Sequence, residues 1–236
     1  MHAGDMISRL KIDDLLRMLD TKFFGNAFRK DFFMLGLPDK EREYFLRTED
    51  PVRFGSFGLA IQRITKEEIP GAFAEVGVYR GASCTVIHAL APGRKLYLFD
   101  TFEGFPEKDL KGWEHKGGVH WSKETFTTSV DFVRKRLGDT RNVEFRKGYF
   151  PDTAKGLENE RFAFVNLDVD LYNPTLAGLE FFYPRLSRGG YIFVHDYNNP
   201  AADRGVSKSL GLFFKDKVEQ MVELPDVGGS VVIRKS

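Results

Sequence analysis

The regular alternation of short apolar runs with longer amphipathic segments after Gly71 constrains the fold more than any other feature of the chain. We expect strands at 72–78, 95–100, 143–148, 161–168 and 191–197, and helices at 80–92, 122–138, 175–190 and 205–217. Two apolar runs around a Gly-rich turn within 218–236 predict a C-terminal hairpin. Strands that alternate with helices form a parallel sheet covered on both faces. The pattern therefore predicts a doubly wound α/β domain with an antiparallel hairpin at its C-terminal end.

The first 65 residues follow a different pattern. Apolar residues recur at helical spacing in "ISRLKIDDLLRMLDTKFF", and "DPVRFGSFGLAIQRI" continues this pattern before Pro70 and Gly71 interrupt it. We therefore expect a helical N-terminal cap or lid at residues 1–65 and the α/β domain at residues 66–236. The apolar helices could equally form a dimer interface, so a homo-oligomer stays open.

The composition limits the partners of the chain. Thirty-five Lys and Arg against thirty-four Asp and Glu give a net charge of +1, which offers no reason to expect nucleic acid or an anionic membrane. The single cysteine excludes an intrachain disulfide and fits a reducing compartment. The N-terminus lacks the apolar core of a signal peptide, and no run approaches the ~18 apolar residues of a membrane span. We therefore expect a cytoplasmic protein.

A glycine loop follows the first predicted strand, at the carboxyl end where doubly wound sheets bind ligands. In Glu75-x-Gly77-x-x-x-Gly81, Gly77 permits a sharp turn and Gly81 lets the next helix start close to the sheet. The spacing fits neither the dinucleotide fingerprint nor a Walker loop. Asp100 ends the second strand about twenty residues later, where an acidic group can accept both hydroxyls of a ribose. We interpret this as a site for a nucleoside cofactor without phosphate, which S-adenosylmethionine (SAM) fits. The alternative is a plain turn and a helix N-cap.

Two carboxylates follow the fourth predicted strand in "FVNLDVDLY". Asp168 and Asp170 would share a face and repel each other unless a cation or a shared proton relieves the repulsion. Asp196 ends the fifth strand, so neighbouring strands would bring it to the same edge. Carboxylate ligands suit Mg²⁺, which could bind a substrate hydroxyl and lower its pKa, while Asp170 accepts the proton as general base. A solvated strand end is the alternative.

Four stretches carry a family resemblance: "FAEVGVYRGASCTVI", "LFDTFEGFP", "VNLDVDLYNPTLAGLEFFYPRLSRGGYIFVHDY" and "GVSKSL". Across residues 50–236 the chain resembles the macrocin O-methyltransferase family, which methylates sugar hydroxyls during macrolide and aminocoumarin antibiotic synthesis. The resemblance implies a Rossmann-like class I methyltransferase sheet, SAM, and Mg²⁺ or another divalent ion. It also implies a small-molecule hydroxyl acceptor, such as a sugar of a natural product.

The resemblance also implies roles for individual residues. The glycine loop and Asp100 would hold the cofactor, with Thr101 and Phe102 near its adenosine. The predicted cofactor-binding residues are Glu75, Gly77, Tyr79, Gly81, Ser83, Asp100, Thr101, Phe102, Gly148 and Asp168. The predicted metal ligands are Asp168, His195 and Asp196, and the predicted catalytic residues are Asp170 and His195.

His195 is the position at which the chain departs from the family pattern, because relatives typically have two adjacent acidic residues there. Asp196 keeps the second of these positions. His195 could ligate a metal through a ring nitrogen, act as a base, displace the metal, or be a structural histidine. One fewer anionic ligand weakens Mg²⁺ binding and favours softer ions such as Mn²⁺ or Zn²⁺.

Two other functions compete with methyl transfer. A metal-dependent glycosyltransferase would use the Asp-x-Asp pair as a clamp for a sugar nucleotide. A non-catalytic SAM-binding protein would have lost the metal through His195. The Gly-rich loop "GWEHKGGVHWS" at residues 112–122 could be a mobile lid over the substrate or an ordinary surface loop.

Overall fold

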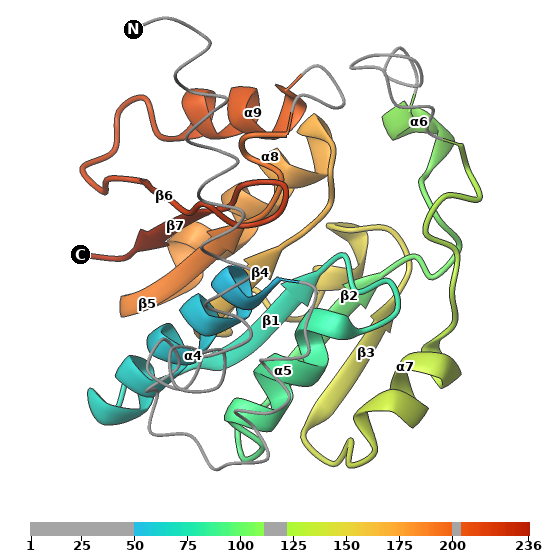
Figure 1. Ribbon diagram of the computed structural model, residues 1–236, viewed down its shortest axis with the longest axis horizontal. Helices are drawn as coiled ribbons and strands as arrows, with labels where there is room; N and C mark the ends of the chain where they lie inside the picture. The colour runs from blue at the N-terminus through green and yellow to red at the C-terminus, as the bar shows by residue number, and fades with distance from the viewer. Residues whose placement is uncertain (1–49, 111–121, 200–203) are drawn as a thin grey trace, which may run out of the picture. The chain divides into compact units, whose positions relative to one another are not determined.

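The computed structural model describes residues 50–110, 122–199 and 204–236, which are built around a seven-stranded sheet (Figure 1). The strands are β1 (Ala72–Val76), β2 (Leu96–Asp100), β3 (Val143–Lys147), β4 (Phe162–Leu167), β5 (Leu186–Val194), β6 (Val222–Glu223) and β7 (Val231–Arg234). Their order is β3-β2-β1-β4-β5-β7-β6, in which β1 to β5 are parallel and β7 is antiparallel to both of its neighbours. The predicted α/β fold with a C-terminal antiparallel hairpin is therefore confirmed.

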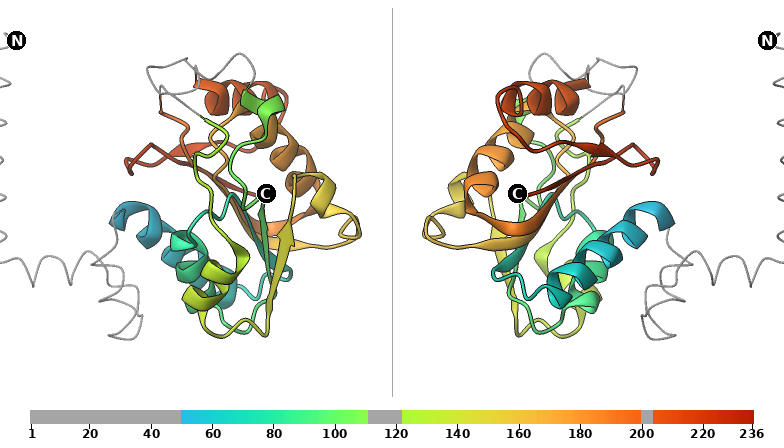
Figure 2. Two further views of the ribbon diagram at one scale, coloured as in Figure 1. Left: turned by 90° about the vertical axis from the view of Figure 1, so that its right-hand side faces the viewer. Right: turned by 90° about the vertical axis from the view of Figure 1, so that its left-hand side faces the viewer.

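Helices cover both faces of this sheet. They are α4 (Pro51–Lys66), α5 (Ala82–Leu90), α6 (Glu107–Leu110), α7 (Val130–Leu137), α8 (Tyr172–Phe182) and α9 (Gly205–Phe213), with short 3₁₀ turns at Asp152–Ala154 and Tyr183–Arg185. Figure 2 shows α4, α5 and α7 on one face and α8 with α9 on the other. This two-sided cover explains why the central strands β1 and β4 are buried along their whole length.

Helix α4 is anchored directly on the sheet. It starts at Asp50, whose side chain accepts the Arg53 backbone N–H at 3.1 Å, and has a proline at its first position. Phe57 is fully buried, with its ring centroid 5.3 Å from that of Phe164 and 4.8 Å from that of Phe193. The sequence pattern placed this helix in an N-terminal cap. The boundary near residue 65 stays a prediction, because residues 1–49 lie outside the described residues.

Two predicted helices are shorter than expected. The helix predicted at 122–138 begins only at Val130, because the Ser129 side chain caps it by accepting the Phe132 N–H at 3.1 Å. The helix predicted at 175–190 ends at Phe182, and β5 already begins at Leu186. Pro184 explains this difference, since it has no N–H to continue the α-helical hydrogen bonds, and the chain passes into the 3₁₀ turn Tyr183–Arg185. The predicted lid at 112–122 lies outside the described residues except for its last position.

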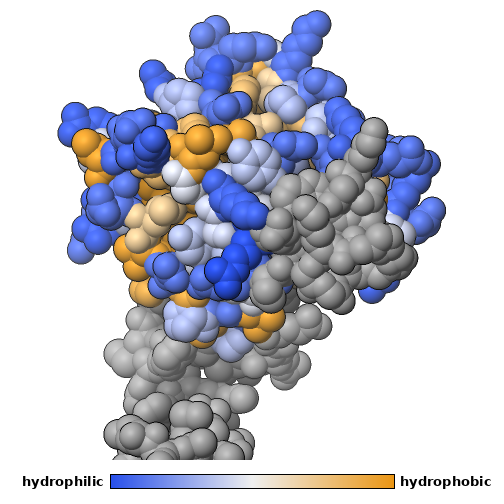
Figure 3. Space-filling model, turned by 90° about the horizontal axis from the view of Figure 1, so that it is seen from above, coloured by the Kyte–Doolittle hydropathy of each residue, from blue (hydrophilic) through white to orange (hydrophobic). Residues whose placement is uncertain are grey.

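The surface gives no sign of a membrane span. Within 50–110, 122–199 and 204–236, every helix is too short or too polar to cross a bilayer. The face seen from above is mixed, with polar side chains surrounding a patch of apolar ones (Figure 3).

The contacts of α4 generate a stability prediction. We expect Phe57→Ala to lower the free energy of unfolding by about 3 to 5 kcal/mol, because it removes a buried ring that packs against two strands. Leu59→Ala is the matched control, since Leu59 lies on the same helix with 59% of its surface exposed and should cost less than about 0.5 kcal/mol. Urea denaturation measures both; equal losses would contradict the anchoring role of Phe57.

Candidate active site

The carboxyl ends of the four central strands carry residues with left-handed backbone geometry. Tyr79 (φ 47°), Phe102 (φ 57°), Asp170 (φ 60°) and Asp196 (φ 59°) follow β1, β2, β4 and β5, which are consecutive in the sheet. This conformation costs non-glycine residues about 1–2 kcal/mol, and such strain concentrates at functional sites. The strand ends are therefore the candidate site.

Gly77 brings the loop after β1 against the end of β4. It has a φ of 86°, and a Cβ atom at this position would lie only 1.8 Å from the backbone oxygen of Asp168. Gly81 has a φ of 76° and starts α5. No other residue type fits at Gly77, so the predicted cofactor loop and the first acidic residue are in direct contact.

Asp100 holds this loop in place through its carboxylate. Oδ2 accepts the backbone N–H groups of Val78 at 2.7 Å and Tyr79 at 2.8 Å, and Oδ1 accepts that of Phe102 at 2.6 Å. These three contacts use three of the about four lone-pair positions of the carboxylate, which leaves about one for another donor. The observed contacts of Asp100 join the loops that follow β1 and β2. Its contact with a ribose stays a prediction.

Glu75 lies fully buried inside β1, behind the glycine loop. Its Oε1 accepts hydrogen bonds from the Ser83 hydroxyl and, at 2.7 Å, from the Asn166 side-chain amide. Its Oε2 is buried without a hydrogen-bond partner among the described residues. Burial raises the pKa of Glu75 to about 8, against the hydrogen bonds from Ser83 and Asn166. The orphan oxygen marks a place where a polar ligand group could bind.

The remaining predicted cofactor residues surround the same strand ends. The Thr101 hydroxyl donates to the Gly104 carbonyl at 2.7 Å, and Phe102 is buried. The Gly148 N–H, just after β3, donates to the Asp100 carbonyl at 2.9 Å. Beside them, the ring centroids of Tyr79 and Phe126 lie 5.0 Å apart. The structure therefore brings the predicted cofactor residues together along β1, β2 and β3.

The acidic cluster contains two cations. Asp168 Oδ2 accepts a hydrogen bond from Arg53 Nη2 at 2.8 Å, and Oδ1 lies 3.1 Å from His195 Nδ1. The same His195 nitrogen lies 2.9 Å from Asp196 Oδ2, and Nε2 lies 2.6 Å from the Val227 carbonyl oxygen. The ends of β4 and β5 do meet as predicted, but with Arg53 of α4 between them.

The charges in this cluster displace the pKa values of its members. Burial alone would raise the pKa of Asp168, but Arg53 and His195 hold it well below its usual range. Burial would lower the pKa of His195, but Asp168 and Asp196 raise it to about 11. Burial, together with the charges of Asp196 and Asp168, raises the pKa of Asp170 well above its usual range. Asp170 is therefore a stronger proton acceptor than Asp168.

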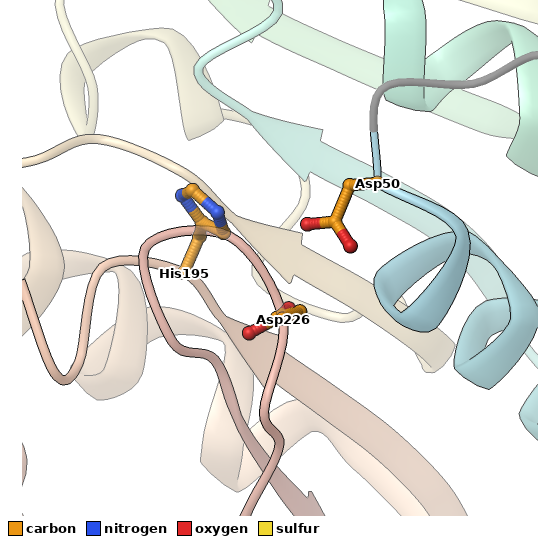
Figure 4. Close-up of side chains that lie close together, drawn as sticks. All are labelled: Asp50, His195 and Asp226. Atoms are coloured by element: carbon orange, nitrogen blue, oxygen red, sulfur yellow. The ribbon is translucent and has the colours of Figure 1, made fainter. Parts of the chain in front are cut away.

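A second group of side chains meets on the other side of His195 (Figure 4). Asp50, His195 and Asp226 bring potential ligand atoms within 4.8 Å of one another. The turn between β6 and β7 is docked here, because Asp50 Oδ2 accepts the Val227 N–H at 3.1 Å. A Cβ atom on Gly228 (φ 82°) would lie 2.9 Å from the His195 ring. The turn therefore fixes the orientation of the imidazole.

Sequence reasoning missed Arg53, Asp50 and Asp226. A signal for Arg53 was present, since it shares the apolar face of α4 with Phe57 and Ile61, and a charged residue on such a face indicates a buried ion pair. Asp50 before a proline carries the signal of a helix N-cap but not of its contact with the turn. No local pattern identifies Asp226.

Beside the cluster is an open hollow of about 590 Å³. It is lined by His195, Asp196, Asn198, Asn199 and the turn residues 224–229. Asp226 Oδ2, in that turn, is buried and has no hydrogen-bond partner among the described residues. The hollow therefore offers polar groups within reach of the acidic cluster.

The ligand atoms of Asp168, His195 and Asp196 lie within 4.8 Å of one another, a spacing that a metal ion could use. Their present contacts, however, do not fit the divalent ion that the resemblance implies. Both oxygens of Asp168 already contact a cation, Arg53 on one side and His195 on the other. A divalent ion bound to Asp168 would be repelled by the Arg53 guanidinium that already contacts this carboxylate. Both nitrogens of His195 also face oxygen atoms, Nδ1 those of Asp168 and Asp196 and Nε2 that of Val227.

Comparison with known proteins identifies relatives. Residues 51–217 match the family model described as Macrocin-O-methyltransferase (TylF). The chain is 29% identical over 210 residues to the 8-demethyl-8-(2,3-dimethoxy-alpha-L-rhamnosyl)-tetracenomycin-C 4'-O-methyltransferase of Streptomyces olivaceus, covering 80% of this chain and 79% of that protein. It is 28% identical to the mycinamicin III 3''-O-methyltransferase of Micromonospora griseorubida, covering 65% and 66%. The calicheamicin methyltransferase CalS11 shares the fold, with a TM-score of 0.67 at 22% identity over 84% of this chain and 86% of that one.

The buried Glu75 generates a pH prediction. Its pKa is raised in the folded protein, so between pH 4.5 and about 8 the unfolded chain releases a proton that the folded chain keeps. Stability must therefore fall as the pH rises through this window, with a limiting slope of about 1.4 kcal/mol per pH unit. Glu75→Gln removes this pH-dependent loss of stability. The melting temperature of the variant minus that of wild type should therefore be larger at pH 8 than at pH 5.

Scanning calorimetry at both pH values measures the effect, with Glu124→Gln in an exposed turn as the matched control. A melting-temperature difference between wild type and Glu75→Gln that is the same at both pH values would contradict the raised pKa.

Proposed function

Because the chain belongs to the macrocin O-methyltransferase family, we propose that it transfers the methyl group of SAM to a hydroxyl group of a small-molecule acceptor, and that this acceptor is a sugar of a natural product. One observation carries the proposal. The glycine loop after β1 touches the backbone of Asp168 after β4, so the loop expected to hold the cofactor and the carboxylates expected to handle the proton lie at the same edge.

The groups at the first strand end fit SAM. Gly77 lets the backbone approach closely, as a bound methionine tail requires, and Glu75 Oε2 behind it has no hydrogen-bond partner in the described part of the chain. Asp100 fixes the loop through three backbone N–H groups. SAM supplies a methyl group on a positively charged sulfur. The chain's own residues orient it and exclude water.

The acceptor hydroxyl needs a base at the moment of transfer. Its oxygen attacks the methyl carbon, the bond from that carbon to sulfur breaks, S-adenosylhomocysteine (SAH) leaves, and the hydroxyl proton passes to the Asp170 carboxylate. Burial and the charges of Asp196 and Asp168 raise the pKa of Asp170, which makes its ionised form a stronger proton acceptor than an ordinary carboxylate. Asp168 is the weaker base, because Arg53 and His195 lower its pKa.

The hollow beside His195 supports a polar acceptor. Its lining includes Asn198, Asn199 and the turn that carries Asp226, whose buried Oδ2 could accept a hydroxyl hydrogen. The named relatives from Streptomyces olivaceus and Micromonospora griseorubida are O-methyltransferases of natural products, and the first acts at a 4' position of a compound that carries a rhamnosyl group. A sugar with several hydroxyl groups therefore suits both the relatives and the hollow.

Two measurements test the proposed function. Calorimetry should show that the purified chain binds SAH, and mass spectrometry should show a gain of one methyl group on a member of a panel of rhamnosylated natural products. Absence of SAH binding would refute the proposal. SAH binding without transfer to any member of the panel would favour the non-catalytic alternative.

The role of Asp170 generates a third prediction. Asp170→Asn should lower kcat by about 10²- to 10⁴-fold, the usual contribution of a general base, while the affinity for SAH changes little. Steady-state kinetics and SAH calorimetry on the same preparation measure both quantities. The matched control is Asp131→Asn, an exposed aspartate on α7 that pairs with Arg134, which should keep wild-type kinetics. A kcat for Asp170→Asn within a few-fold of wild type would show that Asp170 is not the base.

A further inference from the structure

Asp168 is contacted by a cation on each of its oxygens. Arg53 Nη2 lies 2.8 Å from Oδ2, and His195 Nδ1 lies 3.1 Å from Oδ1. The two cations come from different parts of the fold, Arg53 from the first turn of α4 and His195 from the end of β5. Together they cover the oxygen atoms that a metal ion at this strand end would use.

Both ring nitrogens of His195 face oxygen atoms in this arrangement. Its Nδ1 faces the carboxylates of Asp168 and Asp196, and its Nε2 faces the Val227 carbonyl at 2.6 Å. All three partners are acceptors, so both ring nitrogens must carry hydrogen for the contacts to be favourable. A ring that donates on both sides is an imidazolium, and it has no lone pair with which to ligate a metal.

Arg53 is fixed as firmly as His195. Its side chain is buried, its guanidinium lies 5.6 Å from the centre of the Phe57 ring, and its Nη2 also reaches Asn166 Oδ1 at 3.4 Å. Asp50 holds the start of α4 by accepting the Arg53 backbone N–H. The guanidinium therefore cannot swing into solvent to make room for an ion without a rearrangement of the helix start.

We propose that Arg53 and His195 take the place of the divalent ion in this site, so that the chain binds no metal at Asp168 and Asp196. Both are positioning residues: they hold Asp168 ionised and in one orientation and leave Asp170 as the carboxylate available for the acceptor proton. The three carboxylates Asp168, Asp170 and Asp196 then face two fixed positive charges. The proposal rests on the proposed function only for the role of Asp170.

Electron paramagnetic resonance of Mn²⁺ tests the proposal directly. Free Mn²⁺ gives a six-line spectrum that is lost when a protein binds the ion, so no turnover or acceptor is needed. With the full chain and SAH present, we expect equimolar Mn²⁺ to keep the signal of a buffer control. Loss of the signal at one ion per chain, abolished by Asp168→Asn, would overturn the proposal.

A double variant locates the effect. Arg53→Gln with His195→Asp removes both cations and restores an adjacent acidic pair, so it should gain a Mn²⁺ site and lose the free-ion signal. The matched control combines His195→Asp with Arg63→Gln, an exposed arginine on the same helix that pairs with Glu67, and should bind Mn²⁺ more weakly than the double variant. Equal binding by these two variants would refute the part assigned to Arg53. If the double variant does not fold, the wild-type titration alone decides the proposal.

The readouts separate this proposal from the proposed function. Binding of Mn²⁺ by a wild-type chain that also binds SAH would overturn the cation pair and leave methyl transfer intact. Failure to bind SAH, with the Mn²⁺ signal unchanged, would refute methyl transfer and leave the cation pair intact.

Discussion

The contact of Asp168 with Arg53 and His195 is the interaction on which the rest of the site depends. It joins the first turn of α4 to the ends of β4 and β5, three elements that are far apart in the chain. The Arg53 side chain is buried and Asp168 is half-buried, and a buried arginine is costly without a partner. Asp168 and its two partners therefore stabilise one another. The packing of α4 on the sheet through Phe57 keeps Arg53 beside Asp168.

The sheet supplies the geometry in which these charges act. Its central strands end side by side, and the residues after them adopt left-handed backbone conformations that a less constrained loop would relax. Gly77 lets the loop after β1 contact Asp168 at the end of β4. The Asp100 carboxylate holds the same loop by accepting its backbone N–H groups. The proposed cofactor loop and the proposed proton acceptor thus lie at one edge of the sheet rather than at two separate sites.

Much of this edge could be predicted from the sequence. Alternating patterns identify the strands, and carboxyl ends of neighbouring parallel strands must meet, so Glu75, Asp100, Asp168 and Asp196 could be placed together. What could not be predicted depends on contacts between distant residues. The Arg53–Asp168 pair spans 115 positions, and the contact of Asp50 with the β6–β7 turn spans 177. No local periodicity predicts contacts between residues so far apart in the chain. At Asp168 both the carboxylate pattern and the family resemblance predicted a metal ion rather than an arginine.

A crystal structure of the full chain with SAH, grown in the presence of Mn²⁺ and measured at the manganese absorption edge, tests the central claim most directly. The account predicts SAH against the glycine loop, Arg53 and His195 in contact with Asp168, and no anomalous peak between Asp168 and Asp196. An anomalous peak at that position, with Arg53 moved away from Asp168, would contradict it.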